Sequence, residues 1–124
     1  MVSQGPDVDF VILWVDASDP VVSAKHAEAL AEESRKRRVP ESPNRHRDNG
    51  ELLFLLRSIK AHMPWFRKTF LVTNGQRPRY VEFSDRIELV THEQIFPANV
   101  PTPSFNTFAI ESCVHEIEGL SEYF

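Results

Sequence analysis

Residues 47–76, RDNGELLFLLRSIKAHMPWFRKTFLVTNGQ, predict a capped helix that leads into a buried strand. Asp48 and Glu51 have the spacing of a capping box, in which each side chain accepts from a free N–H group in the first helical turn. Pro64 should end the helix, because proline pushes its predecessor out of the α region. Apolar residues recur at steps of three and four, which predicts one buried helical face: Leu52, Leu53, Leu55, Leu56, Ile59 and Met63.

Three segments have the character of strands. Residues 69–73 are a β-branched and aromatic run, which the Gly-containing loop 74–76 breaks. Residues 9–16 are nearly continuous in apolar side chains, as expected for a central parallel strand that is covered on both faces. Residues 87–91 have a mixed polar and apolar pattern, which indicates a strand nearer the edge of the sheet.

Helices are predicted between and after these strands. Residues 21–36 should form a mostly polar surface helix, and a second helix should run from residue 104 or 105 to residue 117. The alternation predicts an α/β fold with a Rossmann-like (GT-A-like) parallel sheet and helical crossovers. Residues 1–8 are expected to be a flexible N-terminus. Residues 121–124 look like the approach to another strand, so residues 9–124 should be the N-terminal half of a larger domain.

Composition narrows the range of functions. The net charge of −4 argues against nucleic acid as a partner. Cys113 is the only cysteine, so neither a disulfide framework nor a thiolate metal cluster is expected. The longest apolar run has six residues, 10–15, whereas a membrane span needs ~20. Asp7 and Asp9 stand where a signal peptide would be basic. A cytoplasmic protein is therefore expected, with peripheral contact to the inner face of the membrane as an alternative.

Polar residues follow each predicted strand. Asp16 and Asp19, the loop 74–76, and His92 should meet at one rim, because parallel strands place their carboxyl ends at the same edge. Such a rim suits a sugar nucleotide: carboxylates bind sugar hydroxyls or a divalent cation, and N–H groups of a Gly turn approach phosphate. Asp19 has a structural alternative, since Ser18 or Asp19 could cap a helix that begins at Pro20.

A basic, proline-containing segment covers residues 35–47. Such a run is most often a solvated loop. Its arginines could instead face a diphosphate, because the planar guanidinium suits phosphate oxygens. Arg47, which adjoins the predicted helix cap, is the strongest candidate among them.

The segment FVILWVDASDP, residues 10–20, resembles the first conserved segment of the Stealth proteins. These sugar-phosphate transferases include bacterial capsule and exopolysaccharide phosphotransferases and the animal N-acetylglucosamine 1-phosphotransferase. The second, longer segment of the family is resembled, in the family's order, by residues 47–49, 55–59, 64–65, 72–76, 90–93 and 109–112.

The resemblance implies transfer of a hexose 1-phosphate, for example N-acetylglucosamine 1-phosphate, from a nucleotide sugar to a sugar hydroxyl, with release of a nucleoside monophosphate. The partners would be a nucleotide-sugar donor and a carbohydrate acceptor in capsule or exopolysaccharide synthesis. Mg²⁺ (or Mn²⁺) would suit the diphosphate. Because attack is at phosphorus, catalysis would rest on positioning, charge neutralisation and deprotonation of the acceptor hydroxyl.

Motif position also implies roles for individual residues. Catalytic roles fall to Asp48, Asn49 and His92, and substrate-binding roles to Asp16, Asp19, Arg47, Arg57, Asn74, Gly75 and Gln76. His115 is a further candidate, and both histidines have a structural role as the alternative. Asp48 has the helix cap as its alternative, worth about 1 kcal/mol. One carboxylate could do both, because the helix dipole would keep it ionised.

The sequence departs from the family pattern at three positions: Ala17 replaces the usual Gly, and Gly50 and Cys113 stand where Glu and His are expected. We carry no role onto Gly50 or Cys113. The family's acidic Asn-Asp-Asp stretch is expected beyond Phe124, so no complete metal site is expected here and these residues alone should be inactive.

Two other functions fit the same residues. A half domain could hold a nucleotide sugar or a partner chain without turnover. A GT-A-like glycosyltransferase would attack the anomeric carbon and release a nucleoside diphosphate. Self-association is also expected, because a sheet that lacks its later strands leaves apolar surface uncovered.

Overall fold

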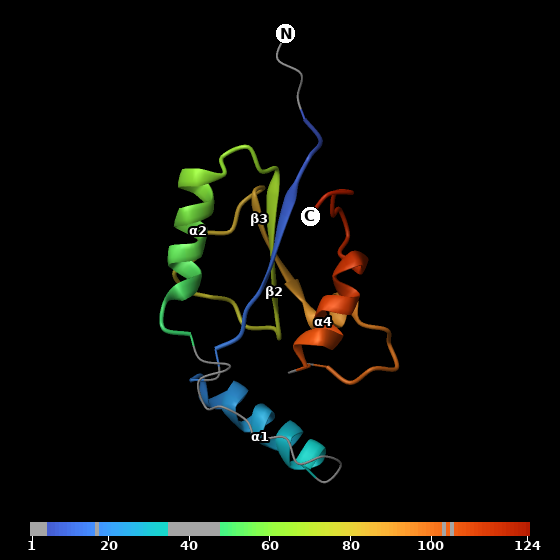
Figure 1. The fold of residues 1–124 in the computed structure, drawn as a ribbon. Coiled ribbons are helices and arrows are strands. Elements are labelled where there is room, and N and C mark those ends of the chain that lie inside the picture. The colour runs from blue at the N-terminus through green and yellow to red at the C-terminus, as the bar shows by residue number, and fades with distance from the viewer. Residues whose placement is uncertain (1–4, 17, 35–47, 103, 105) are drawn as a thin grey trace.

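The computed structural model describes residues 5–16, 18–34, 48–102, 104 and 106–124. Three parallel strands form one sheet, with α2 and α4 on opposite sides of it and α1 beyond the carboxyl end of β1 (Figure 1). The elements are β1 (Asp9–Leu13), α1 (Pro20–Ser34), α2 (Glu51–His62), β2 (Lys68–Thr73), β3 (Ile87–Thr91), α3 (His92–Ile95), α4 (Thr107–Cys113) and a 3₁₀ turn, η1 (Val114–Glu116). The α/β class and the parallel strands are confirmed.

The strand order β1-β2-β3 corrects one expectation. The apolar run at residues 9–16 predicts a central strand, but β2 is central: its residues Thr69–Thr73 are at most 1% exposed, and β1 beyond Asp9 is only half-buried. Both faces of β1 are covered, which explains its apolar run. An apolar run shows that both faces of a strand are covered, but it does not show whether both edges of the strand pair with neighbouring strands.

Side chains of the strands alternate between two apolar layers. Phe70 and Val72 of β2 join a cluster that includes Ile110 of α4, and Leu71 joins a cluster with Leu52 of α2. This is the period-two alternation of a pleated strand with both faces buried. The two layers fix α2 and α4 against the sheet, and therefore fix the residues at its carboxyl edge.

The start of α2 differs from the predicted capping box. Gly50 is the N-cap, with φ of 93°, and no side chain caps the helix. Asp48 Oδ1 accepts the Gly50 N–H at 2.9 Å, and Glu51 Oε2 accepts the Asn49 N–H at 2.5 Å. The predicted capping box is therefore wrong: Asp48 and Glu51 accept from N–H groups that precede the helix, not from its first turn. Gly50 takes the N-cap position because glycine adopts the left-handed conformation without strain.

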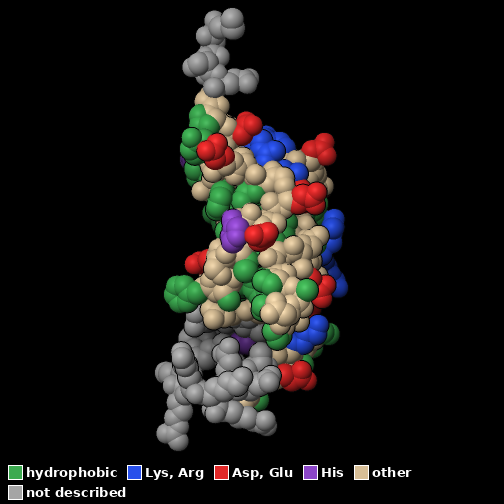
Figure 2. All heavy atoms as spheres, turned by 90° about the vertical axis from the view of Figure 1, so that its right-hand side faces the viewer, with side chains coloured by type: hydrophobic (Ala, Val, Ile, Leu, Met, Phe, Trp, Pro, Cys, Tyr) green, Lys and Arg blue, Asp and Glu red, His purple; other side chains and the backbone are tan. Residues whose placement is uncertain are grey.

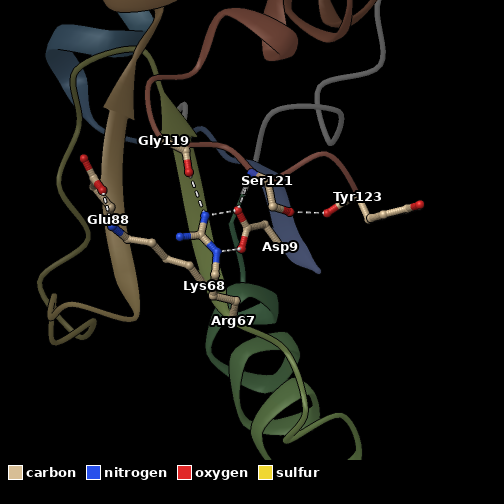
Figure 3. Close-up of polar contacts among 7 residues, drawn as sticks. All are labelled: Asp9, Arg67, Lys68, Glu88, Gly119, Ser121 and Tyr123. Carbon is tan, nitrogen blue, oxygen red and sulfur yellow. Dashed lines mark hydrogen bonds and ion pairs between the residues drawn. The ribbon is translucent and has the colours of Figure 1, made fainter. Parts of the chain in front are cut away.

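An ion pair between an exposed guanidinium and a buried carboxylate lies where β1 and β2 begin (Figure 3). Asp9, 1% exposed, accepts from Arg67 Nε at 2.9 Å, from Arg67 Nη2 at 2.5 Å and from the Ser121 N–H at 2.8 Å. Arg67 Nη2 also donates to the Gly119 carbonyl at 2.6 Å. Burial raises the pKa of Asp9, but the hydrogen bonds from Arg67 and Ser121 outweigh it and hold the pKa below its ordinary value.

This ion pair fastens the last residues to the sheet. The Asp9 N–H donates to the Tyr123 carbonyl at 3.0 Å, and Tyr123 forms an isolated parallel bridge with Val8. The bridge lies on the edge of β1 that faces away from β2. Residues 121–124 therefore approach the sheet as the start of a strand does, in agreement with the prediction.

Charges on the α4 side of the molecule are mixed. Among the described residues on this side, acidic, basic and apolar side chains are interspersed (Figure 2), so these residues do not form a continuous basic surface. Within the described ranges, no helix is long and apolar enough to cross a membrane.

Candidate active site

The loops that follow β1 and β2 are tied together. Gln76 Oε1 accepts the Asp16 N–H at 2.9 Å, and Gln76 Nε2 donates to the Asp16 carbonyl at 3.0 Å. These two reciprocal bonds bring together two of the sequence candidates, at the carboxyl edge where open α/β sheets bind ligands.

The carboxylates of the first loop have local partners. Asp16 Oδ1 accepts from Ser18 N at 3.0 Å and from Ser18 Oγ at 2.6 Å. Asp19 Oδ1 accepts from Val21 N at 2.9 Å and from Val22 N at 3.4 Å, so Asp19 caps α1, which begins at Pro20. The structural alternative for Asp19 is confirmed, and donor binding by both carboxylates stays a prediction.

The glycine loop after β2 satisfies its own backbone. Gly75, with φ of 112°, donates its N–H to Thr73 Oγ1 at 3.1 Å, and the Gln76 N–H donates to Asn74 Oδ1 at 3.2 Å. A phosphate at this loop would therefore have to displace side-chain acceptors that already occupy both N–H groups. Substrate binding by these three residues stays a prediction.

A cleft of about 370 Å³ lies at the carboxyl end of β1. Its wall is mainly apolar and comes from β1, α2, β2 and α4. Its polar side chains are Asp48, Glu51, His92, Ser104 and Thr107. The cleft thus brings together Asp48 and His92, two predicted catalytic residues that are 44 positions apart (92 − 48).

Other sequence candidates lie away from the cleft lining. Asn49 is exposed and hydrogen-bonds Glu51, and Arg57 is exposed on α2. Asp16, Asp19 and the loop 74–76 are likewise absent from the lining residues. His115 is exposed and pairs with Glu116 at 3.0 Å. Arg47 lies outside the described residues.

Asp48 is held as a carboxylate by donors on both oxygens. Oδ1 accepts the Gly50 N–H at 2.9 Å, and Oδ2 accepts the Tyr80 hydroxyl. Burial raises the pKa of Asp48, but the hydrogen bonds from Tyr80 and Gly50 more than offset this and hold the pKa below its ordinary value. Asp48 therefore presents an ionised carboxylate to the cleft at neutral pH.

His92 is buried, with 4% of its surface exposed. Its Nδ1 accepts the Ser104 N–H at 3.1 Å, and its ring stacks on Phe96 with centroids 5.8 Å apart. Burial lowers the pKa of His92 to about 4, so the imidazole is neutral at pH 7. Since Nδ1 is an acceptor, the proton lies on Nε2, which makes His92 a hydrogen-bond donor at that atom.

Comparison with known proteins identifies the family. The sequence model of the family described as Stealth protein CR2, conserved region 2, matches residues 45–124. The chain belongs to the Stealth family. The predicted resemblance is thereby confirmed, and both the cleft residue Asp48 and the buried His92 lie inside the matched region.

Relatives of this Stealth chain have consistent names. It is 35% identical to the capsular polysaccharide phosphotransferase eps5J of Streptococcus thermophilus over 118 residues, which are 94% of this chain and 49% of that protein. It is 48% identical to the mouse N-acetylglucosamine-1-phosphotransferase subunits alpha/beta over 84 residues, 67% of this chain and 7% of that protein. It is 38% identical to the exopolysaccharide phosphotransferase SCO2594 of Streptomyces coelicolor over 120 residues, 94% of this chain and 19% of that protein. The chain spans about half the length of the Streptococcus thermophilus protein.

Sequence reasoning missed two side chains beside Asp48. Tyr80 lies in the loop between β2 and β3 and gives no signal in a one-dimensional pattern. Trp14 lines the cleft, and its buried indole N–H lies close enough to Asp48 to help lower the pKa of that carboxyl.

The metal expectation can be tested against the donor groups. Over the residues that the structure describes, no three His, Cys, Asp or Glu side chains gather so as to hold a metal ion. Asp48 and Glu51 share the cleft, but two carboxylates alone are a poor match to the six or more oxygens of a Mg²⁺ or Ca²⁺ site. We therefore derive no step through a metal from these residues.

The neutral state of His92 predicts a pH-dependent stability. In the unfolded chain the imidazole of His92 is protonated near its ordinary pKa of 6.5, whereas in the folded chain it stays neutral down to about pH 4. Stability should therefore fall as the pH falls through this window, by about 2 kcal/mol between pH 7.5 and pH 5. Urea unfolding at both pH values measures this change.

Two variants isolate the contribution of His92. His92→Gln should flatten the pH dependence between pH 7.5 and pH 5, because the buried titrating group is gone. His115→Gln, at an exposed position, should keep the parent's slope. Equal slopes in the parent and His92→Gln would contradict a buried neutral imidazole.

Proposed function

We propose that this chain is the donor-side part of an enzyme that transfers a hexose 1-phosphate from a nucleotide sugar to a sugar hydroxyl. The observation that carries the proposal is that an ionised carboxylate, Asp48, and a neutral imidazole donor, His92, line the same cleft of a Stealth chain. The relatives named above are phosphotransferases of capsular or exopolysaccharides or of N-acetylglucosamine 1-phosphate, which supports this substrate class.

In the proposed reaction the acceptor hydroxyl oxygen attacks the phosphorus attached to the sugar. A new P–O bond forms, the bond to the nucleoside monophosphate breaks, and the hydroxyl proton passes to a base. In this proposal Asp48 accepts that proton. A weakly basic carboxylate suffices because in a loose transition state the proton leaves late. His92 Nε2–H is suited to donate to a phosphoryl oxygen.

The remaining parts of the proposal concern the whole enzyme. The parallel sheet would belong to a Rossmann-like, GT-A-like domain. Mg²⁺ or Mn²⁺ would neutralise the diphosphate, with ligands drawn largely from outside the described residues. A cytoplasmic location, with or without peripheral contact to the membrane, would give access to nucleotide sugars.

The released nucleotide tests the reaction type. The complete natural polypeptide, supplied with a nucleotide sugar and an oligosaccharide acceptor, should release the nucleoside monophosphate and leave the phosphate on the acceptor. Chromatography of the nucleotides and ³¹P NMR of the product measure both. A nucleoside diphosphate would indicate the glycosyltransferase alternative. Tight donor binding without turnover would indicate the binding-module alternative.

Self-association is a separate expectation for the 124-residue chain. From Phe10 to Leu13, the outer edge of β1 has no neighbouring strand in the described part of the sheet, and unpaired edges are templates for pairing. Sedimentation velocity should therefore show a fraction of dimer that increases with protein concentration. A single monomeric species at the highest soluble concentration would contradict this expectation.

A further inference from the structure

We propose that Tyr80 is the positioning residue of the site: its hydroxyl orients the Asp48 carboxylate toward the cleft. This inference rests on the proposed function, because it assigns Asp48 to the reaction. The contact joins residues that lie 32 positions apart, from the loop between β2 and β3 and from the segment before α2.

The loop that carries Tyr80 is firmly packed. Val81, the next residue, is 8% exposed and packs with Leu52 of α2 and Leu71 of β2. Three residues before Tyr80, the Arg77 guanidinium lies over the ring of Phe83 at 4.3 Å. The backbone on both sides of Tyr80 is thus fixed in the apolar layer between α2 and the sheet. This packing holds the Tyr80 hydroxyl at Asp48.

The geometry separates the roles of the two residues. Asp48 lines the cleft, whereas Tyr80 does not. Oδ2 of Asp48 accepts from the Tyr80 hydroxyl, and Oδ1 accepts from the Gly50 N–H. These two hydrogen bonds fix the orientation of the carboxylate. Tyr80 is 42% exposed, and its hydroxyl is the group that contacts the site, through Asp48. Tyr80 therefore acts through Asp48.

A double-mutant cycle in the complete enzyme tests this role. Tyr80→Phe removes only the hydroxyl and should lower kcat about tenfold with KM within about twofold, the scale of one hydrogen bond to a charged group. In an Asp48→Asn background the same change should have no further effect, because the carboxylate that it orients is gone. An equal loss in both backgrounds would show a structural role and overturn the proposal.

The chain provides a matched control and a readout that is independent of activity. Its other tyrosine, Tyr123, is 53% exposed at the opposite end of the sheet, so Tyr123→Phe should leave kcat unchanged. With ¹³C-labelled tyrosine, the phenol carbon of Tyr80 should shift at neutral pH on Asp48→Asn, while that of Tyr123 stays in place. No shift at Tyr80 would overturn the contact. An inactive parent enzyme with the shift present would instead refute the proposed function.

Discussion

Asp48→Asn should lower the turnover of the complete enzyme by at least about 100-fold, the usual scale for losing an acid–base group. The amide keeps an oxygen for the Gly50 N–H, and asparagine is accepted in this kind of turn as readily as aspartate. The free energy of unfolding should therefore change by about 1 kcal/mol or less. Steady-state or single-turnover kinetics and urea unfolding measure the two effects separately.

Asp85→Asn is the matched control for this variant. Asp85 is exposed in the turn before β3, away from the cleft lining, so the same chemical change there should leave turnover intact. Turnover near the parent's level in Asp48→Asn would remove Asp48 from the catalytic residues and leave it with its structural contacts alone.

The second large effect concerns stability. Arg67→Ala leaves the buried carboxylate of Asp9 without its cation, and an unpaired buried charge costs about 3–5 kcal/mol. The Arg67 side chain is 37% exposed, so water can partly replace it, and we expect a loss near the lower end of that range. Urea unfolding followed by circular dichroism gives the free energy.

A nearby surface ion pair provides the control. Lys68 and Glu88 approach to 2.6 Å, but Glu88 is 48% exposed, and Glu88→Gln should cost at most about 1 kcal/mol. Combining Asp9→Asn with Arg67→Ala should cost less than the sum of the single changes, because no buried charge remains unpaired. Comparable losses in Arg67→Ala and Glu88→Gln would show that Asp9 is not a desolvated charge.

The pKa of Asp9 adds a pH test of the same contact. Because the folded state lowers this pKa below its ordinary value of 3.8, the stabilisation is present above that value and is lost as the pH falls through the lowered pKa. Arg67→Ala should therefore flatten the acid limb of the stability curve below about pH 4.

Local patterns in the sequence predicted the elements well. The apolar steps from Leu52 to Ile59 and the proline at position 64 bounded α2, and the β-branched run at residues 69–73 became the central strand. These features succeed because side-chain periodicity and backbone restriction act within a few residues. The short helix α3 was missed, since four residues carry too little periodicity to detect.

The site was predicted in part. Asp48 and His92 were named from motif position, and the structure places both on one cleft. The hydrogen-bond donors to these two residues could not be predicted: Tyr80 meets Asp48 through the packing of a loop, and the Ser104 N–H reaches His92 from twelve positions along the chain. Such contacts depend on tertiary structure, which no local spacing encodes.

The closure between Asp9 and Ser121 spans 112 positions. On the ribosome, β1 is made first, and its buried carboxylate receives this donor only after residue 121 has left the exit tunnel. Contacts of such long range also slow folding in free solution, because loop entropy is lost before the contact is gained. The nascent strand therefore waits for 112 further residues, and during that interval its unpaired edge is a surface that a chaperone can bind.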